Sequence, residues 1–144
     1  MVGTSKASRS SNKARGTLYE HRFIVQCLER GLAPFIPIES GSAQDLLVMN
    51  RDSTVFRVQV KGTSVPVQKG QGVVRYKISA STGQYVKQVI DCEKIDIIAA
   101  YIDPLDSWYI IPCDEVNVTS VWISPSSQTS RFEKYKDYWE LFAN

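Results

Sequence analysis

Apolar residues change their spacing near residue 35, and this change separates a predicted helix from a series of predicted strands. Within residues 17–30 the apolar positions recur at helical spacing, and Gly31 follows as a natural stop. Thr17 and Glu20 have the separation of a capping box, so we expect the helix to begin at Thr17. Glu20 nevertheless falls within the apolar arc of this helix. A bare carboxylate is costly to bury there, so it must be capped, paired or bound to a metal.

Alternating apolar and polar residues predict short strands over most of the remaining chain. Residues 95–102 are nearly all apolar, which indicates a central strand covered on both faces. Residues 132–142 place aromatic side chains on one stripe and predict a closing amphipathic helix. This order predicts an α/β or α+β domain with one central mixed β-sheet flanked by helices. The expected strands are 35–38, 45–49, 54–61, 73–80, 95–102 and 108–112, with an edge strand within 116–123.

Basic residues are concentrated in the first part of the chain. Residues 1–15 carry Lys and Arg among Ser, Gly and Ala without apolar periodicity, so we expect a flexible basic arm, either a solvated tail or a segment that lies along a phosphate backbone. Residues 16–144 have the length of a single domain. Residues 1–90 carry 13 Lys and Arg against 5 Asp and Glu, whereas residues 91–144 carry 4 against 10. Clustered cations release counterions from phosphates, so this asymmetry favours a polyanionic partner.

Two kinds of segment that are missing from the sequence indicate the cellular compartment of the protein. The chain has no run of the roughly 20 apolar residues that a membrane helix needs, and no apolar signal segment follows its basic start. We therefore expect a cytoplasmic protein that does not bind membranes. Cys27, Cys92 and Cys113 are too few and too far apart for a zinc ribbon or a disulfide framework, so we expect reduced, mostly buried thiols.

The strand expected at residues 54–61 carries candidate chemistry. Alternation places Gln59 and Lys61 on the same face of that strand. The turn that precedes the strand is centred near residues 51 and 52, so Asp45 should lie opposite about residue 59. A carboxylate, an amide oxygen, a strand carbonyl and a cation are therefore expected in one small volume. The alternative is a surface hairpin with ordinary polar residues on its open face.

Hard oxygen ligands of this kind suit Mg²⁺, which binds through one or two carboxylates, waters and substrate phosphates. The expected ligands are Asp45, Gln59 and the backbone carbonyl of Val60, and Glu20 is the best candidate for a second carboxylate. Lys61 would hydrogen-bond the attacking water and the scissile phosphate.

Three segments carry a family resemblance: Gly-Thr-Leu-Tyr-Glu at 16–20, Ser-Gly-Ser-Ala-Gln-Asp-Leu-Leu-Val at 40–48, and Arg-Val-Gln-Val-Lys at 57–61. In this order they resemble the PD-(D/E)xK nuclease superfamily. The third segment, together with residues 108–112 and 114–116, is similar to the group I intron-encoded homing endonuclease subgroup. The resemblance covers most of residues 16–142. It implies a restriction-endonuclease-like core of one helix, a mixed sheet and a second helix. It also implies Mg²⁺-dependent hydrolysis of DNA phosphodiesters, with Mn²⁺ as a substitute and no nucleotide cofactor.

The resemblance also implies a role for each matching residue. Asp45 would be the main metal ligand, Glu20 the helix carboxylate, Gln59 the replacement for the usual Glu or Asp, and Lys61 the catalytic lysine. Gln44 stands where a proline is common in the superfamily. Because Gln59 brings no charge, metal affinity must depend on Asp45 and Glu20.

A long connection at residues 62–72 leads into the strand expected at 73–80, and a hairpin of this kind fits a major groove. Gln and Arg can read base edges, whereas Lys neutralises phosphates. For each candidate taken alone, the alternative is a solvated surface position. The DNA-contact candidates are Arg22, Ser40, Ser42, Gln68, Lys69, Gln71, Arg75 and Lys77.

One such site can hydrolyse one DNA strand, so cutting a duplex requires at least two copies related by a two-fold axis. We expect a homo-oligomer, at least a dimer, and the homing subgroup implies a tetramer. The leading hypothesis is a sequence-specific homing endonuclease that makes double-strand breaks in DNA and is associated with the nucleoid when it acts. One alternative is a Holliday junction resolvase, which shares the helix Glu, the Asp and the final Lys. Another is a DNA-binding module whose nuclease site has decayed.

Overall fold

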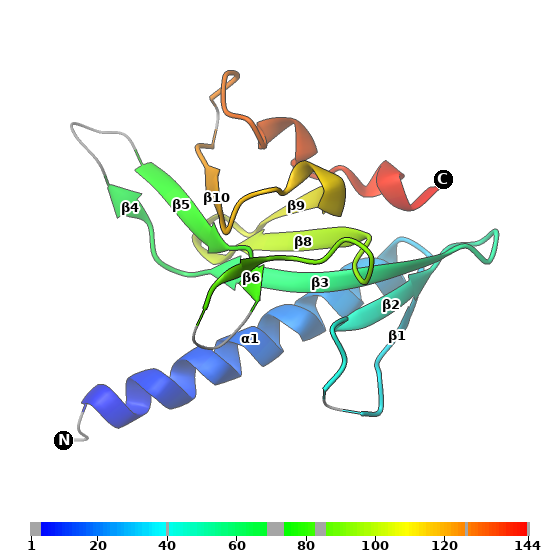
Figure 1. Cartoon of the computed structure of the whole chain (residues 1–144), viewed down its shortest axis with the longest axis horizontal. Coiled ribbons are helices and arrows are strands. Elements are labelled where there is room, and N and C mark those ends of the chain that lie inside the picture. The colour runs from blue at the N-terminus through cyan, green and yellow to red at the C-terminus, as the bar shows by residue number, and fades with distance from the viewer. Residues whose placement is uncertain (1–3, 40, 69–73, 83–85, 126, 144) are drawn as a thin grey trace.

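The computed structural model describes residues 4–39, 41–68, 74–82, 86–125 and 127–143, with side chains from residue 13 onward. One α-helix, α1 (Thr4–Glu29), crosses one face of a central sheet (Figure 1). Among the described residues, no helix is both long and apolar enough to cross a membrane.

The helix α1 begins at Thr4, not at Thr17 as the sequence suggested. Thr17 lies inside the helix, where its hydroxyl donates to the carbonyl of Lys13 at 3.3 Å, so the predicted capping box is wrong. Residues 4–15, expected as a flexible basic arm, continue the helix. Adding turns to a formed helix costs far less than nucleating one, so a segment without its own apolar face can still be helical here. Gly31 follows the helix with φ +74°, as its predicted stop requires.

The central sheet has five strands in the order β1-β2-β3-β8-β9: β1 (Ala33–Phe35), β2 (Leu46–Met49), β3 (Val55–Thr63), β8 (Ile97–Ile102) and β9 (Ser107–Pro112). The β3–β8 pair is parallel and the other pairs are antiparallel. The predicted mixed sheet is therefore confirmed.

A smaller three-stranded sheet has the order β10-β5-β4, with β5 (Val74–Ser79) between β10 (Ser120–Ile123) and β4 (Val67–Gln68). Figure 1 shows β4 and β5 projecting from the body of the molecule. A further antiparallel pair, β6 (Ser81–Thr82) and β7 (Gln88–Val89), forms a separate two-stranded sheet and lies between β5 and β8 in the sequence.

The strand β8 separates two cores, and all six of its residues are buried, as predicted for a central strand. Ile97, Ala99 and Tyr101 pack in the core shared with α1. Ile98, Ala100 and Ile102 pack in the other core, together with the inner residues of β5 and β10. Strand alternation thus places α1 and the smaller sheet on opposite faces of the central sheet.

The predicted closing helix at 132–142 is wrong. This segment forms two short 3-10 turns, η3 (Glu133–Tyr135) and η4 (Trp139–Ala143). Between them Asp137 adopts φ +53°, and its N–H donates to the carbonyl of Trp108 at 2.9 Å. This pairing with β9 interrupts helical hydrogen bonding, so the aromatic side chains reach the core from turns. Two further 3-10 turns, η1 (Asp103–Leu105) and η2 (Cys113–Glu115), flank β9.

The prediction of three reduced cysteines is wrong for two of them. Cys92 and Cys113 form a disulfide. The pairing of Ile97 with Pro112 in the β8–β9 ladder brings the segments before β8 and after β9 together, although they are distant in sequence. Cys27 is a free, fully buried thiol in the core under α1, and burial raises its pKa to about 12.

Candidate active site

Asp45 lies immediately before the first residue of β2, beside the part of β3 that extends beyond β2. Leu46 pairs with Val58, so the predicted position of Asp45 opposite Gln59 agrees with the observed register. The N–H of Asp45 donates to the carbonyl of Val58 at 3.0 Å, and Oδ2 of Asp45 accepts the N–H of Val60 at 2.8 Å. The carboxylate therefore takes the place of a strand carbonyl and continues the hydrogen-bond ladder of β3 beyond the end of β2.

This bond fixes one oxygen of Asp45 and directs the other. Oδ1 accepts no hydrogen bond from the described side chains or backbone, which leaves it available to a cation. Burial raises the pKa of Asp45, while the bond from Val60 and the charge of Lys61 act in the opposite direction. Asp45 is thus a partly buried acid with a cationic neighbour.

Glu20 belongs to the interior of α1, so helix capping no longer explains a carboxylate on its apolar side. Burial raises the pKa of Glu20, and the charge of Asp45 raises it further. The charge of Asp45 therefore disfavours ionisation of Glu20. A cation between them would offset both the repulsion and the desolvation.

Lys61 projects from β3 on the face opposite α1, and its Nζ lies 3.5 Å from the carbonyl oxygen of Ser81. Burial lowers the pKa of Lys61, the charge of Asp45 raises it, and the charge of Lys87 lowers it. Lys87 is a second cation near the site that the sequence did not reveal. It lies in the connection between β6 and β7, where no periodic pattern marks it.

Gln59 shares the open face of β3 with Lys61, as predicted, and lines a cavity of about 490 Å³. Ser42 lines the same cavity, so the structure brings these two candidates together. The Ser42 hydroxyl donates to Oε1 of Gln44 at 2.6 Å, and the Gln44 amide donates to the carbonyl of Lys94 at 2.9 Å. Gln44 therefore holds the rim of the cavity in place.

A second cavity, of about 470 Å³, extends from Lys61 to Arg15 at the edge of α1. Arg15 donates to the hydroxyl of Ser64 at 2.8 Å. Gly62 makes the close approach of α1 possible, because a Cβ built on it would lie 2.3 Å from the ring of Tyr19.

Several DNA-contact candidates lie elsewhere. Arg22 faces the other flank of α1, where it donates to the hydroxyl of Tyr101 at 2.8 Å and pairs with Asp103 at 3.2 Å. The structure does not bring Arg22 to the site. Gln68 lies exposed on β4, while Arg75 and Lys77 lie on β5. Ser40, Lys69 and Gln71 fall outside the described residues.

The donor types proposed around Asp45 are oxygens, which a hard divalent cation prefers. Among the described residues, no group of three or more His, Cys, Asp or Glu side chains could hold a metal. The ligands proposed from the sequence would be the two carboxylates of Glu20 and Asp45 and two neutral oxygens, from Gln59 and the carbonyl of Val60. One or two carboxylates with neutral oxygens and substrate phosphates are the ligands that Mg²⁺ uses in nucleic-acid enzymes. A softer metal would call for thiolate or imidazole ligands instead.

Comparisons with known proteins give the fold and the family of the chain. The fold is similar to that of the bacterial homing endonuclease I-Ssp6803I, with a TM-score of 0.70, 19% sequence identity and coverage of 96% of this chain and 93% of that one. Hjc, a Holliday junction resolvase from the archaeal hyperthermophile Archaeoglobus fulgidus, matches with a TM-score of 0.48, 17% identity and coverage of 78% and 85%. No curated protein sequence matches the chain. The family model for PD-(D/E)XK endonucleases matches residues 10–142, and the chain therefore belongs to the PD-(D/E)XK endonuclease family.

Proposed function

We propose that this chain is a Mg²⁺-dependent, sequence-specific DNA endonuclease of the homing type, which makes double-strand breaks by hydrolysing phosphodiesters. The carboxylate of Asp45, held by the Val60 N–H and acting electrostatically on both Glu20 and Lys61 in a chain of an endonuclease family, carries this proposal. The homing type rests on the segments 57–61 and 108–116, with support from the similarity in fold to a bacterial homing endonuclease.

Asp45 and Glu20 would hold the Mg²⁺ ion, with Gln59 and the carbonyl of Val60 completing the protein ligands. Mn²⁺ would substitute. When bound, such an ion stabilises negative charge on the scissile phosphate and makes water a better nucleophile. The Val60 N–H orients Asp45, so this ligand is positioned before the substrate arrives.

Lys61 would act directly on the reacting phosphate. Its partly buried ammonium lies on the same open face of β3 as Gln59 and is attracted by Asp45. From this position it can donate a hydrogen bond to the phosphate oxygen on which negative charge develops, and it can orient the attacking water. Lys87 adds positive charge beside it and favours the same phosphate.

The DNA partner would be double-stranded. Arg75, Lys77, Lys87, Arg15 and Lys69 are the proposed phosphate contacts, and Gln68 and Gln71 are the proposed base contacts. A two-strand cut requires at least a homodimer, and a tetramer would span a longer target. We place this activity in the cytoplasm, on chromosomal DNA.

The purified protein should be incubated with a supercoiled plasmid library, linear duplexes and a synthetic four-way junction, in Mg²⁺ or in EDTA. We expect a linear plasmid product in Mg²⁺ alone and no product from Lys61→Ala. Cleavage confined to the four-way junction would indicate a junction resolvase instead. A gel shift of duplex DNA without cleavage in either Mg²⁺ or Mn²⁺ would indicate a DNA-binding module with a decayed site.

A further inference from the structure

The outer face of the smaller sheet carries an unusual set of side chains. Tyr76 and Ile78 of β5 point into the core, so Arg75, Lys77 and Ser79 face outward. In the adjacent β10, Trp122 pairs with Lys77 and therefore shares this outer face. Trp122 belongs to neither hydrophobic core.

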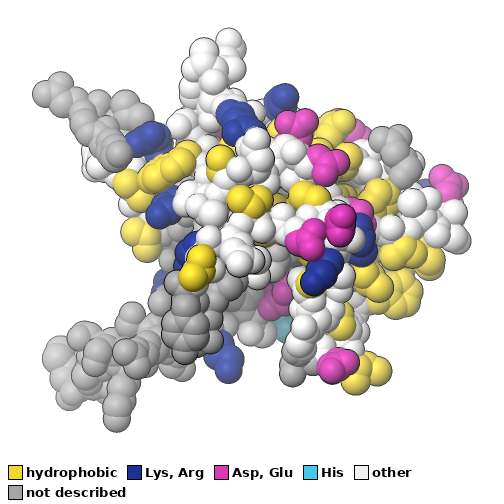
Figure 2. Space-filling model, in the orientation of Figure 1, with side chains coloured by type: hydrophobic (Ala, Val, Ile, Leu, Met, Phe, Trp, Pro, Cys, Tyr) yellow, Lys and Arg dark blue, Asp and Glu magenta, His cyan; other side chains and the backbone are white. Residues whose placement is uncertain are grey.

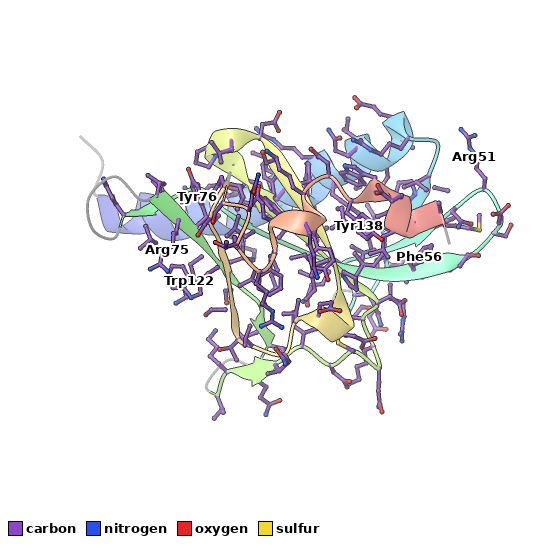
Figure 3. The ribbon with its side chains drawn as sticks, turned by 90° about the horizontal axis from the view of Figure 1, so that it is seen from above. Arg51, Phe56, Arg75, Tyr76, Trp122 and Tyr138 are labelled. Carbon is purple, nitrogen blue, oxygen red and sulfur yellow. A yellow bond between two sulfur atoms is a disulfide. The ribbon has the colours of Figure 1, made fainter. Side chains whose placement is uncertain are left out.

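Trp122 instead lies beside two cations. The guanidinium carbon of Arg75 lies 4.8 Å from the centre of the Trp122 ring, and Nζ of Lys77 lies 6.0 Å from it. Figure 3 shows Arg75 and Trp122 next to each other on the same side of this sheet. Both distances are within the range of cation–π attraction, for which Trp is the strongest partner.

Two polar contacts connect the end of β5 to the proposed catalytic lysine. The hydroxyl of Ser79 lies 3.2 Å from that of Ser81. The carbonyl of Ser81 is the group that Lys61 approaches at 3.5 Å. Two polar contacts through the buried Ser81 therefore link Ser79, at the end of the strand that carries Arg75 and Lys77, to Lys61. At the end of the molecule that carries β4 and β5, Figure 2 shows Lys and Arg side chains on the face in view and no acidic ones among the coloured residues.

Stacking on an aromatic ring leaves the binding groups of an arginine free. The guanidinium uses its flat face for the ring, while its N–H donors lie in the plane and point outward at the edge. Those donors match the oxygens of a phosphate. A ring that holds such a side chain extended also reduces the conformational entropy lost when DNA binds.

We propose that Trp122 is a positioning residue for DNA. It holds Arg75 and Lys77 on the outer face of β5, whose end is linked through Ser79 and Ser81 to Lys61, so that they bind phosphates of the duplex on the same side of the protein as the scissile bond. This inference rests on the proposed function and adds to it the aromatic residue through which two of the proposed phosphate contacts act.

A double-mutant cycle on DNA affinity tests this role. Binding of a fluorescein-labelled duplex of mixed sequence would be measured by anisotropy in EDTA, so that no cleavage intervenes. We expect Trp122→Leu to weaken binding roughly 5-fold, the loss of two cation–π contacts at a partly exposed site. Trp122→Phe should weaken binding less, because Phe still presents a ring face. In the Arg75→Gln/Lys77→Gln background, both Trp122 substitutions should have no further effect.

The contribution of Arg75 and Lys77 can be measured separately, through the salt dependence of DNA affinity. The Arg75→Gln/Lys77→Gln variant should lower the slope of log affinity against log salt by about 1.8, because each phosphate contact contributes about 0.9. Arg30→Gln is the matched control. The guanidinium carbon of Arg30, just after the C-terminal end of α1, lies 4.0 Å from the centre of the Trp139 ring. That control removes a cation–π pair of the same kind and should leave DNA affinity unchanged.

An unchanged affinity in Trp122→Leu, or a loss that persists in the Arg75→Gln/Lys77→Gln background, would overturn the inference, because a merely structural tryptophan would act independently of the two cations. Thermal unfolding of each variant confirms that it is folded. If Trp122→Leu does not fold, the comparison of Trp122→Phe in the two backgrounds decides the question alone. If the wild-type chain binds no duplex, the proposed function is itself wrong, and this result precedes any comparison of variants.

Discussion

The side-chain oxygen of Asp45 accepts the backbone N–H of Val60 at 2.8 Å, so a proposed metal ligand is also part of the sheet. The bond extends the pairing of β3 past the first residue of β2, and it sets the direction in which the second oxygen of Asp45 points. The same carboxylate is thus both an acceptor in the sheet and a proposed metal ligand. Two substitutions distinguish these two roles.

Asp45→Asn keeps an oxygen acceptor for Val60 but removes the charge. We expect it to lower the cleavage rate by at least about 100-fold, as the loss of an electrostatic group at a reacting phosphate does. Because burial raises the pKa of Asp45, its ionised form disfavours folding, so the Asn variant should be at least as stable as the wild type. Asp45→Ala should lose activity and also about 1–3 kcal/mol of unfolding free energy, because the Val60 N–H loses its acceptor. Wild-type cleavage by Asp45→Asn would remove Asp45 from the site.

The raised pKa values of Glu20 and Asp45 predict how stability depends on pH without metal. For an acid whose folded pKa lies above its unfolded value, the stabilising contribution is complete below the unfolded pKa and is lost as pH rises through the folded one. In EDTA the melting temperature should therefore fall as the pH is raised from the acid range through the raised pKa values of both groups. Glu20→Gln should reduce this fall.

Mg²⁺ should reverse this loss near neutral pH, because a ligand that binds only the folded state stabilises it. The Glu20→Gln/Asp45→Asn variant should show no such response. Differential scanning calorimetry with and without Mg²⁺ measures both effects. An equal Mg²⁺ response in the wild type and the double variant would contradict a metal site at these two acids.

Much of the geometry of the candidate site could be predicted from the sequence, because strand periodicity determines on which face of the sheet each side chain lies. Alternation placed Gln59 and Lys61 on one face of β3, and the position of the turn predicted the register that the Leu46–Val58 pair confirms. Each of these inferences needs only local spacing and a short hairpin. The buried strand β8 was predicted on the same basis.

The features that were missed depend on tertiary contacts. Lys87 is near Lys61 only because β6 and β7 fold back over the sheet. The closing segment has a helical stripe of aromatic residues, yet Asp137 pairs with β9 and interrupts the helix. No local pattern distinguishes these outcomes, since the competing interaction comes from a distant part of the chain.

Gln59→Glu should strengthen metal binding. The substitution adds a third carboxylate next to Asp45, and affinity for a hard cation rises with the number of charged oxygen ligands. We expect the Mg²⁺ concentration for half-maximal cleavage to fall several-fold. Gln88→Glu is the matched control, because Gln88 lines the same cavity from β7 and is not a proposed ligand. The same fall in Gln88→Glu would mean that the effect is one of general charge and not of ligation.

Gly62→Ala should destabilise the protein at the junction of α1 and β3. The added Cβ would lie 2.3 Å from the Tyr19 ring, so the helix or the strand must move, at a cost of about 1–3 kcal/mol. Gly16→Ala is the matched control. A Cβ at Gly16 meets nothing within 4 Å, and replacing a helical glycine should stabilise the protein by about 0.5–1 kcal/mol. Urea denaturation of the two variants should give changes of opposite sign.

The disulfide between Cys92 and Cys113 predicts both a thiol count and a stability difference. Without reductant, the denatured chain should expose one reactive thiol, that of Cys27, and after reduction it should expose three. The bridge spans 21 residues and restricts the unfolded chain, so reduction should lower the unfolding free energy by about 3 kcal/mol. The Cys92→Ala/Cys113→Ala variant should show this lower stability at all times and no response to reductant. Three reactive thiols in the unreduced, denatured chain, or an equal response of the wild type and the variant, would show that the pair is not bonded in solution.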